Sequence, residues 1–399
     1  MEKQDFIITS LQPWDIEIGS TIKNTALEIA KKNRVLYVST PLDISSRLKG
    51  DKHSVAYRHR MEVIKGKISP IRQIAPNMWI LDCPFTLLSV NILPTPLFNY
   101  FNRMNNKKIG NWIIQQATTL GFKNYIHLID TDIFRSRYLK EYIHPAVSIY
   151  YRRDYIIGET YWRKHGPRSE MELATSADIV LANSTHFAAE LATYNPNTYP
   201  IETGVNLELY NASQIYETPM DIQTIPHPII GYLGTVNSTR LNGDLLYELA
   251  LQRPKYSFVF TGPEDEGFQV HKIHTLKNVY FLGKKVVKEL PAYLQAYDVC
   301  INPQMVNEIT DGNYPLKIDE YLAMGKPTVA TSTHTMRDIF ASHTHLASNQ
   351  EEWLIAIDTA VSEVGKKILE QERIAFAETH SWGHSVKKIY GIIENFLKK

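Results

Sequence analysis

The sequence is poor in cysteine and contains no motif typical of a metal centre. Its 399 residues include two cysteines, Cys83 and Cys300, which lie far apart and inside apolar stretches, and it has no CxxC or HExxH motif. Such cysteines predict buried free thiols in a reducing compartment rather than a disulfide. We therefore expect neither a metal nor another cofactor.

Long hydrophobic runs and an excess of charge are also absent. No window approaches 18 uninterrupted apolar residues, and MEKQDFIITSLQPWD lacks the basic-then-apolar pattern of a signal peptide. We expect a cytoplasmic protein. The 43 lysines and arginines nearly balance the 42 aspartates and glutamates, for a net charge of +1. That balance argues against a dedicated nucleic-acid-binding protein, which needs excess cations to neutralise phosphates.

Strand–helix alternation is present, in two successive runs. A chain of 399 residues is too long for one typical hydrophobic core, so two domains are expected. The predicted strands are DFIITSL, RVLYVST, MWILDCP, NYIHLID, AVSIYY and DIVLANS, then PIIGYLG, YSFVFTG, NVYFLG, DVCINP and PTVATS. This alternation predicts an α/β protein with two Rossmann-like, doubly wound domains that face each other across a cleft.

The breaks in this pattern give the expected domain boundaries. We predict an N-terminal domain over 1–210, a linker over 211–227 and a C-terminal domain over 228–378. The final segment, 379–399, is amphipathic and has no strand after it. We expect it to form a helix that packs back on the N-terminal domain.

The stretch PLKIDEYLAMGKP contains the most specific pattern of charges. Pro315 suits the first position of a helix, where its missing N–H costs nothing. The amides of Leu316 and Lys317 are then available to a phosphate, and Lys317 adds a positive charge. Glu320 lies three residues on, on the same helix face, and Gly325 suits the helix end. A surface pair of little consequence is the alternative, but a phosphate-and-ribose site fits these residues better.

Two further motifs are less specific. IIGYLGTV delivers Gly231 and Gly234 at a strand end, where glycine lets a backbone approach a ligand, although a plain tight turn explains them equally well. IDTD contains Asp130 and Asp132, a D-x-D pair of the kind that holds a metal in one class of sugar transferases. The two-domain layout does not suit that class, so we do not expect metal binding there.

The segment NEITDGNYPLKIDEYLAMGKP resembles the donor-site signature of GT-B glycosyltransferases. It is most similar to bacterial polysaccharide enzymes of family 4 and the teichuronic-acid type, and to the xanthan glucuronosyltransferase. GYLGTV, FTGP and LPAYLQAYDVCINP are similar to the donor half, and RSEMELATSADIVLANS with ETGVNLELY to the end of the acceptor half. The resemblance covers most of the chain. It implies metal-independent transfer of a sugar from a nucleotide diphosphate, UDP by preference, to a glycan or lipid-linked acceptor.

The resemblance also assigns residues. It implies that Lys317 meets the donor pyrophosphate and that Glu320 meets the ribose, with Pro315 and Leu316 at the same helix start. The other donor contacts that it implies are Gly234 and Thr235 at the phosphate pocket, Gly262 and Pro263 on the nucleobase side, and Thr310 and Tyr314 on the loop facing the donor sugar.

On the acceptor side, YYRRDY occupies the place where these enzymes often have a strand that ends in an acid. Asp154 is therefore the candidate general base for an acceptor hydroxyl; a solvated aspartate paired with Arg152 or Arg153 is the alternative. Four residues near the first helix start are expected on the same side: Trp14, Asp15, Gly19 and Ser20.

One position departs from the family pattern. Retaining family 4 enzymes usually have a glutamate eight positions before the ribose-binding one, where this chain has Gly312. Glu308, Asp311 and Asn313 are nearby but out of register. The departure leaves both retention and inversion open, and Asp154 makes an inverting displacement at least as plausible.

Aromatic and basic residues alternate in 90–114, VNILPTPLFNYFNRMNNKKIGNWII. One interpretation is a loop and helix packed on the first domain. The other is a membrane-surface patch, which would place the protein peripherally on the inner face of the cell membrane.

Two rival functions remain: a nucleotide-sugar epimerase of the same fold, and a non-catalytic nucleotide-sugar-binding relative.

Overall fold

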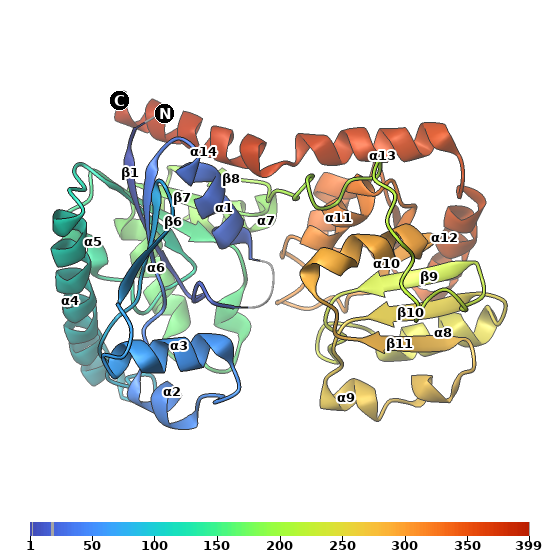
Figure 1. Ribbon diagram of the computed structural model, residues 1–399, viewed down its shortest axis with the longest axis horizontal. Coiled ribbons are helices and arrows are strands. Elements are labelled where there is room, and N and C mark those ends of the chain that lie inside the picture. Colours follow the sequence, from blue (N-terminus) through green and yellow to red (C-terminus); the bar gives the residue numbers. More distant parts are fainter. Residues whose placement is uncertain (2, 17–19, 399) are drawn as a thin grey trace. The chain divides into compact units, whose positions relative to one another are not determined.

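The computed structural model describes residues 1, 3–16 and 20–398, which divide into two compact units (Figure 1). Unit 1 comprises Met1–Ile201 and Val386–Lys399, and unit 2 comprises Glu202–Ser385. The segment 211–227, for which a linker was predicted, belongs to unit 2, because Ile222 and Ile225 are buried in the core of that unit.

Unit 1 is built on an eight-stranded sheet in the order β3-β4-β2-β1-β5-β6-β7-β8. All neighbouring strands are parallel except the β3–β4 pair. Helices on both faces bury the central strands, which explains their nearly continuous apolar sequences. The strands are β1 (Asp5–Ser10), β2 (Arg34–Val38), β3 (Ile71–Ala75), β4 (Met78–Leu81), β5 (Ile126–Asp130), β6 (Val147–Arg152), β7 (Ile179–Ala182) and β8 (Thr198–Pro200).

The helices of unit 1 come mainly from its first 200 residues. The last helix of the chain, α14 (Trp382–Leu397), adds Val386, Ile389 and Ile393 to the core that contains Phe6 and Ile22. The other α-helices are α1 (Thr21–Ala30), α2 (Ile44–Lys49), α3 (Val55–Ile64), α4 (Thr95–Thr119), α5 (Leu139–Ile143), α6 (Gly166–Ser176) and α7 (Thr185–Ala192).

Unit 2 has a six-stranded parallel sheet in the order β11-β10-β9-β12-β13-β14. Its side chains alternate between two cores, so that Val299 and Ile301 join one core and Cys300 joins the other. The strands are β9 (Ile229–Leu233), β10 (Ser257–Thr261), β11 (Val279–Gly283), β12 (Val299–Asn302), β13 (Thr328–Thr331) and β14 (His345–Ala347). The α-helices are α8 (Gly243–Gln252), α9 (Glu266–Gln269), α10 (Leu290–Ala296), α11 (Leu316–Ala323), α12 (Gln350–Ser362) and α13 (Lys367–Thr379).

Each sheet has a point at which the strand order reverses. In unit 1 this point is β1, which pairs with β2 and β5, and in unit 2 it is β9, which pairs with β10 and β12. Ligands of doubly wound proteins bind outside the carboxyl ends of the strands at such points. The loops after β1 and β9 are therefore the places to look for a site.

The predicted α/β architecture is confirmed, and both cysteines are buried free thiols as predicted. The strands that the sequence did not reveal are β3, β8 and β14, all at sheet edges. Within the described residues, no helix combines the length and the apolar character needed to cross a bilayer.

Candidate functional site

In unit 2 the structure brings together two of the predicted site residues, Lys317 and Gly234, where β9 ends. The Lys317 Nζ donates a hydrogen bond to the Tyr232 hydroxyl at 2.6 Å and lies 4.0 Å from the centre of the Tyr232 ring. A Cβ on Gly234, whose φ is +137°, would lie 3.0 Å from the same Nζ. An ammonium group is thus held against a bare stretch of backbone, which is an arrangement suited to a phosphate.

Gly262 fixes the neighbouring turn. Its φ is +154°, and a Cβ at this position would collide with the carbonyl oxygen of Gly234. The Gly234 amide donates to the Thr261 carbonyl at 2.9 Å, and the Val236 amide donates to the Pro263 carbonyl at 2.9 Å. The turns after β9 and β10 therefore pack directly on each other, and both require glycine.

Helix α11 supplies Lys317, although it begins one residue later than predicted. Pro315 is the residue before the helix, and the Leu316 amide donates to the Tyr314 carbonyl at 3.2 Å. The Leu316 amide is therefore already engaged, contrary to the prediction. At the other end of the helix, Gly325 has a φ of +71°, the left-handed conformation that suits a helix end.

Glu320 lies on the same helix in a half-buried position. Burial raises the pKa of its carboxyl to about 7, while the Tyr210 hydroxyl and the Lys317 charge act in the opposite direction. A carboxyl group with such a pKa changes its charge near neutral pH. Neither Tyr210 nor Tyr232 was found from the sequence, because Tyr210 was assigned to the end of the first domain and Tyr232 was read as a buried strand residue.

The two residues expected to face the donor sugar, Thr310 and Tyr314, are buried and hydrogen-bonded within unit 2. Tyr314 is 8% exposed, and its hydroxyl donates to the buried Asp319 carboxylate at 2.6 Å, which also contacts His380 Nδ1 at 2.8 Å. Thr310 is 2% exposed, and its hydroxyl donates to the Met305 carbonyl. Both side chains stabilise the loop.

The environment of Gly312 offers no obvious replacement for the expected glutamate. Asp311 accepts a hydrogen bond from the His334 amide at 2.8 Å, and the Gly312 carbonyl accepts one from the Thr335 hydroxyl at 3.0 Å. Glu308 is exposed. A second expectation changes as well: a Cβ on Gly231 would collide with the Tyr297 ring, so this glycine accommodates a core aromatic side chain rather than a ligand.

In unit 1, Asp154 follows β6 and is the more exposed of the acids near it. Its side chain is 46% exposed, and its carboxylate lies 3.8 Å from Arg153 Nη1. Arg153 bonds mainly to Asp130, which is fully buried and also accepts a hydrogen bond from the Ser10 hydroxyl at 2.6 Å. Asp132 accepts a hydrogen bond from the Arg135 amide at 3.1 Å. The D-x-D pair is therefore engaged in holding the loops after β5 and β6.

The loop after β1 contains the predicted acceptor-side residues. Trp14 packs edge-on against Tyr37, with ring centroids 5.1 Å apart, and Lys23 Nζ lies 5.1 Å from the Trp14 ring centre. The buried Ser20 donates a hydrogen bond to the Gln12 side chain. Gly19 falls outside the described residues.

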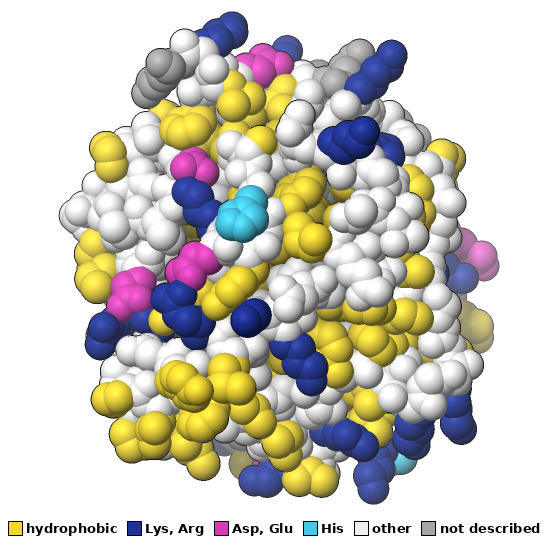
Figure 2. Space-filling view, turned by 90° about the vertical axis from the view of Figure 1, so that its left-hand side faces the viewer, with side chains coloured by type: hydrophobic (Ala, Val, Ile, Leu, Met, Phe, Trp, Pro, Cys, Tyr) yellow, Lys and Arg dark blue, Asp and Glu magenta, His cyan; other side chains and the backbone are white. Residues whose placement is uncertain are grey.

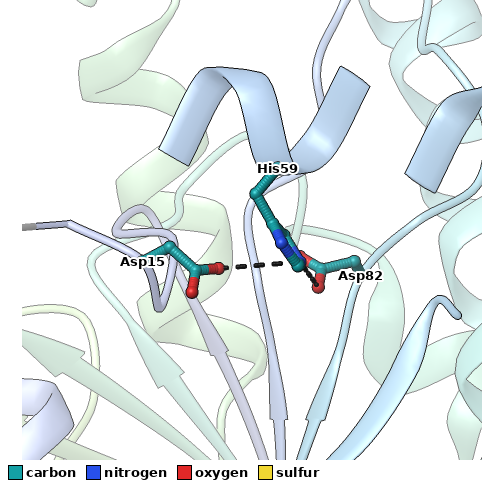
Figure 3. A group of neighbouring side chains, drawn as sticks. All are labelled: Asp15, His59 and Asp82. Carbon is teal, nitrogen blue, oxygen red and sulfur yellow. Dashed lines mark hydrogen bonds and ion pairs between the residues drawn. The ribbon is translucent and has the colours of Figure 1, made fainter. Parts of the chain in front are cut away.

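Asp15, from the same loop, belongs to a cluster that the sequence did not reveal (Figure 3). The His59 Nε2 lies 3.0 Å from Asp82 Oδ2 and 3.7 Å from Asp15 Oδ2. Arg72 Nη2 donates to both oxygens of Asp15, at 2.7 and 2.6 Å, and Arg72 Nη1 lies 3.4 Å from His59 Nδ1. The members come from four separate segments, so no local motif indicated the cluster.

The spacing of these atoms would suit a metal ion, but the position of the Arg72 guanidinium beside His59 does not. A histidine that binds a metal through Nε2 carries its proton on Nδ1 and donates it to an acceptor. Here Nδ1 faces the guanidinium group of Arg72, which only donates. The contacts fit a His59 ring that accepts at Nδ1 and donates from Nε2 to Asp82. We therefore describe the cluster as a hydrogen-bonded network at the carboxyl edge of the sheet.

Comparison with known proteins finds a family match within unit 2. Residues 227–370 match the family described as "Glycosyl transferases group 1". TuaH of Bacillus subtilis strain 168, whose name describes a glycosyltransferase of teichuronic acid biosynthesis, is 26% identical over 238 residues. The match covers 57% of this chain and 59% of TuaH, so the chain spans well under two thirds of that relative.

Solved structures match the fold over nearly the whole chain. Sucrose-phosphate synthase of Thermosynechococcus elongatus has a TM-score of 0.69 and 14% identity, with coverage of 99% of this chain and 100% of that one. HepE of Anabaena in complex with UDP-glucose has a TM-score of 0.65 and 15% identity, with coverage of 98% and 99%. A glycosyltransferase of Rickettsia africae has a TM-score of 0.66 and 15% identity and covers both chains completely.

Proposed function

We propose that this chain, which has a GT-B-like fold and whose residues 227–370 match the group 1 glycosyltransferases, transfers a sugar from a UDP-sugar to an acceptor of bacterial surface polysaccharide synthesis. TuaH supports the polysaccharide assignment through its name, and HepE supports the donor because it is described as a complex with UDP-glucose. The acceptor in this proposal is a glycan or a lipid-linked sugar.

The observation that carries the proposal is the position of Lys317. Its ammonium group lies beside the Gly234 backbone and is oriented by the Tyr232 hydroxyl and ring. When the bond between sugar and diphosphate breaks, negative charge develops on the leaving diphosphate. A cation already held in place stabilises that charge without reorganisation. Lys317 thereby takes the role of a metal ion, and Glu320 accepts hydrogen bonds from the ribose.

For the acceptor half, we propose that Asp154 takes the proton from the acceptor hydroxyl. It is the exposed acid at the carboxyl end of β6, while its neighbours Asp130 and Asp132 are buried and already bonded. An inverting displacement needs one such base. The glycine at position 312, in place of the usual glutamate, agrees with this route.

The experiment for donor and acceptor combines binding with turnover. Thermal unfolding in UDP, ADP and GDP and their sugars identifies the donor, because a ligand present at 100 times its Kd stabilises the native state by about 2.7 kcal/mol. Asp154→Asn should retain UDP-sugar binding and lose transfer by about 100-fold or more. A non-catalytic relative would show binding without turnover and indifference to Asp154→Asn, and an epimerase would convert or hydrolyse the donor without any acceptor.

We also propose that α4 and the loop before it bind an anionic membrane surface. The inward face of α4 carries buried asparagines, with Asn102 and Asn106 donating to the Phe134 carbonyl. The outward side is apolar in its first turns: Leu97, Tyr100 and Met104 are 48%, 64% and 48% exposed. A surface helix in water usually carries polar side chains on its outward face.

Figure 2 shows the side of unit 1 on which α4 lies, where hydrophobic side chains gather with lysine and arginine side chains around them. Ile92, just before the helix, is 83% exposed, and Lys107 and Lys108 follow on the exposed side of α4. Apolar insertion beside cations is how peripheral helices bind anionic lipid.

Co-sedimentation with lipid vesicles tests this contact. The protein should bind vesicles that contain anionic lipid more strongly than neutral ones, and the double variant Ile92→Ser, Tyr100→Ser should lose that binding. Ile355→Ser, which alters a 60% exposed isoleucine of unit 2, is the control. Equal binding by both variants would refute the membrane contact.

A further inference from the structure

Arg135 is a mostly buried arginine without a hydrogen-bond acceptor. It follows β5, and its side chain is 15% exposed. Its nearest carboxylate oxygen, Asp132 Oδ1, lies 4.0 Å from Nη1, and this oxygen is already used by the Arg135 amide. Among the described residues, none accepts a hydrogen bond from the Arg135 guanidinium. Because this group has five N–H donors, burial without an acceptor is costly.

A second arginine at the same sheet edge bonds to backbone carbonyls. Arg60, on α3, is half-buried and donates to two backbone carbonyls, from Nε to Ala56 and from Nη1 to Thr40, both at 3.0 Å. No carboxylate of the described chain lies within ion-pair distance of it. Burial lowers the pKa of Arg60, and the charge of Arg135 lowers it further, whereas the charges of Asp82 and Asp15 act in the opposite direction.

Contacts across the sheet place Arg60 and Arg135 at the same edge. Thr40, whose carbonyl accepts from Arg60, lies two residues after β2 and donates from its hydroxyl to the Ser10 carbonyl at the end of β1. Ser10 is paired with Asp130 at the end of β5, and Arg135 lies in the turn that follows. Both guanidinium groups therefore belong to the carboxyl edge of the sheet, at its switch point.

Other arginines of unit 1 show the contrast. Arg72 is bonded to Asp15, Arg153 to Asp130 and Arg137 to Glu172. In each case the fold supplies a carboxylate to a buried or half-buried guanidinium group. Among the described residues, Arg60 has no such carboxylate, and Arg135 has only the Asp132 carboxylate, at 4.0 Å. Two adjacent guanidinium groups with unused donors are the residues that bind phosphate or carboxylate groups of ligands.

We propose that Arg60 and Arg135 bind an anionic group of the acceptor, either a phosphate of a lipid carrier or the carboxylate of an acidic sugar. The inference rests on the proposed function, since it assigns a substrate class to the acceptor side of the same enzyme. It goes beyond that function in requiring a charged acceptor: a neutral glycan would supply no anion to the unused donors of the two guanidinium groups.

The test measures anion binding while the donor site is filled. Calorimetric titrations with inorganic pyrophosphate and, separately, with D-glucuronate are carried out at saturating UDP, so that neither anion reports on the UDP site. The wild type should bind at least one of them, and which one it binds identifies the source of the anionic group. Arg135→Gln and Arg60→Gln should each weaken this binding at least tenfold.

Arg58→Gln is the matched control, because Arg58 lies on the same helix but is exposed. It should bind the anion as the wild type does, and all three variants should bind UDP unchanged, which shows that they are folded. Arg135→Lys, which keeps the charge but loses the planar fork, should restore part of the affinity. Binding of neither anion by the wild type, or equal anion binding by Arg135→Gln, overturns the inference. Failure of UDP to bind the wild type contradicts the proposed function instead.

Discussion

We expect UDP-glucose to bind more tightly at pH 8 than at pH 6, because Glu320 changes its charge between these values. Burial raises the pKa of Glu320 to about 7 in the ligand-free protein. Ribose hydroxyls donate hydrogen bonds most strongly to a carboxylate, so the bound nucleotide favours the ionised form. At pH 6 binding must therefore remove a proton from Glu320, whereas at pH 8 the proton has already left.

The size of the effect follows from the pKa. A group with a pKa near 7 is ionised to about one-tenth at pH 6 and to about nine-tenths at pH 8. The apparent affinity scales with the fraction of protein in the binding-competent form. The account therefore predicts a gain of about 10-fold, or roughly 1.4 kcal/mol, over these two pH units.

Isothermal titration calorimetry with UDP-glucose measures this gain. The sugar blocks the terminal phosphate, so the ligand itself does not ionise near neutral pH, as free UDP would. Glu320→Gln provides the comparison, since its amide cannot ionise and its affinity should be flat over the same range. A flat profile for the wild type, or the same slope in both proteins, would refute the assignment of Glu320 to the ribose.

Three further predictions concern stability and the support of Lys317. The folded protein holds the Glu320 proton more tightly than the unfolded chain, in which this carboxyl has its ordinary pKa of 4.5. Glu320 therefore lowers the stability of the wild type as pH rises from about 4.5 to 7. Urea unfolding should show that Glu320→Gln gains stability relative to the wild type at pH 8 but not at pH 4. Gly262→Ala should lower the free energy of unfolding by about 1–3 kcal/mol, because the alanine would have a strained φ and would collide with Gly234. Gly391→Ala, in open space on α14, should raise the free energy of unfolding by about 0.5–1 kcal/mol. Equal effects of these two variants would contradict the local geometry. Tyr232→Ala should weaken UDP binding several-fold by freeing the Lys317 side chain, since a cation–π contact contributes about 0.5–2 kcal/mol, and unchanged titration calorimetry would show that Lys317 needs no such support.

The strands predicted from the sequence are those that a local sequence pattern determines. Buried parallel strands such as β1 and β9 are continuous apolar runs, so their periodicity and their glycine-containing ends were visible. The strands that were missed are short or lie at sheet edges, such as β8 and β14 with three residues each. Their pairing depends on a neighbour far along the chain rather than on their own sequence.

The same distinction explains the candidate site. Lys317 and Glu320 were identifiable because they lie on one helix face, three residues apart. Tyr232 meets Lys317 from 85 positions away, and Asp15, His59 and Asp82 meet from three separate segments. Tyr314 was assigned to the donor sugar because of its place in the motif, yet its hydroxyl bonds to the buried Asp319. Contacts of this kind depend on the folded chain and leave no periodic signal.

The central claim is that Lys317 binds the diphosphate of the donor, and the affinity of UDP for Lys317→Ala tests it most directly. A charge-assisted contact of about 1.5–3 kcal/mol corresponds to a loss of roughly 10- to 150-fold in affinity by titration calorimetry. Lys288→Ala, which removes an exposed lysine of the same unit, should bind UDP as the wild type does. Equal UDP affinity for Lys317→Ala and the wild type would contradict the account.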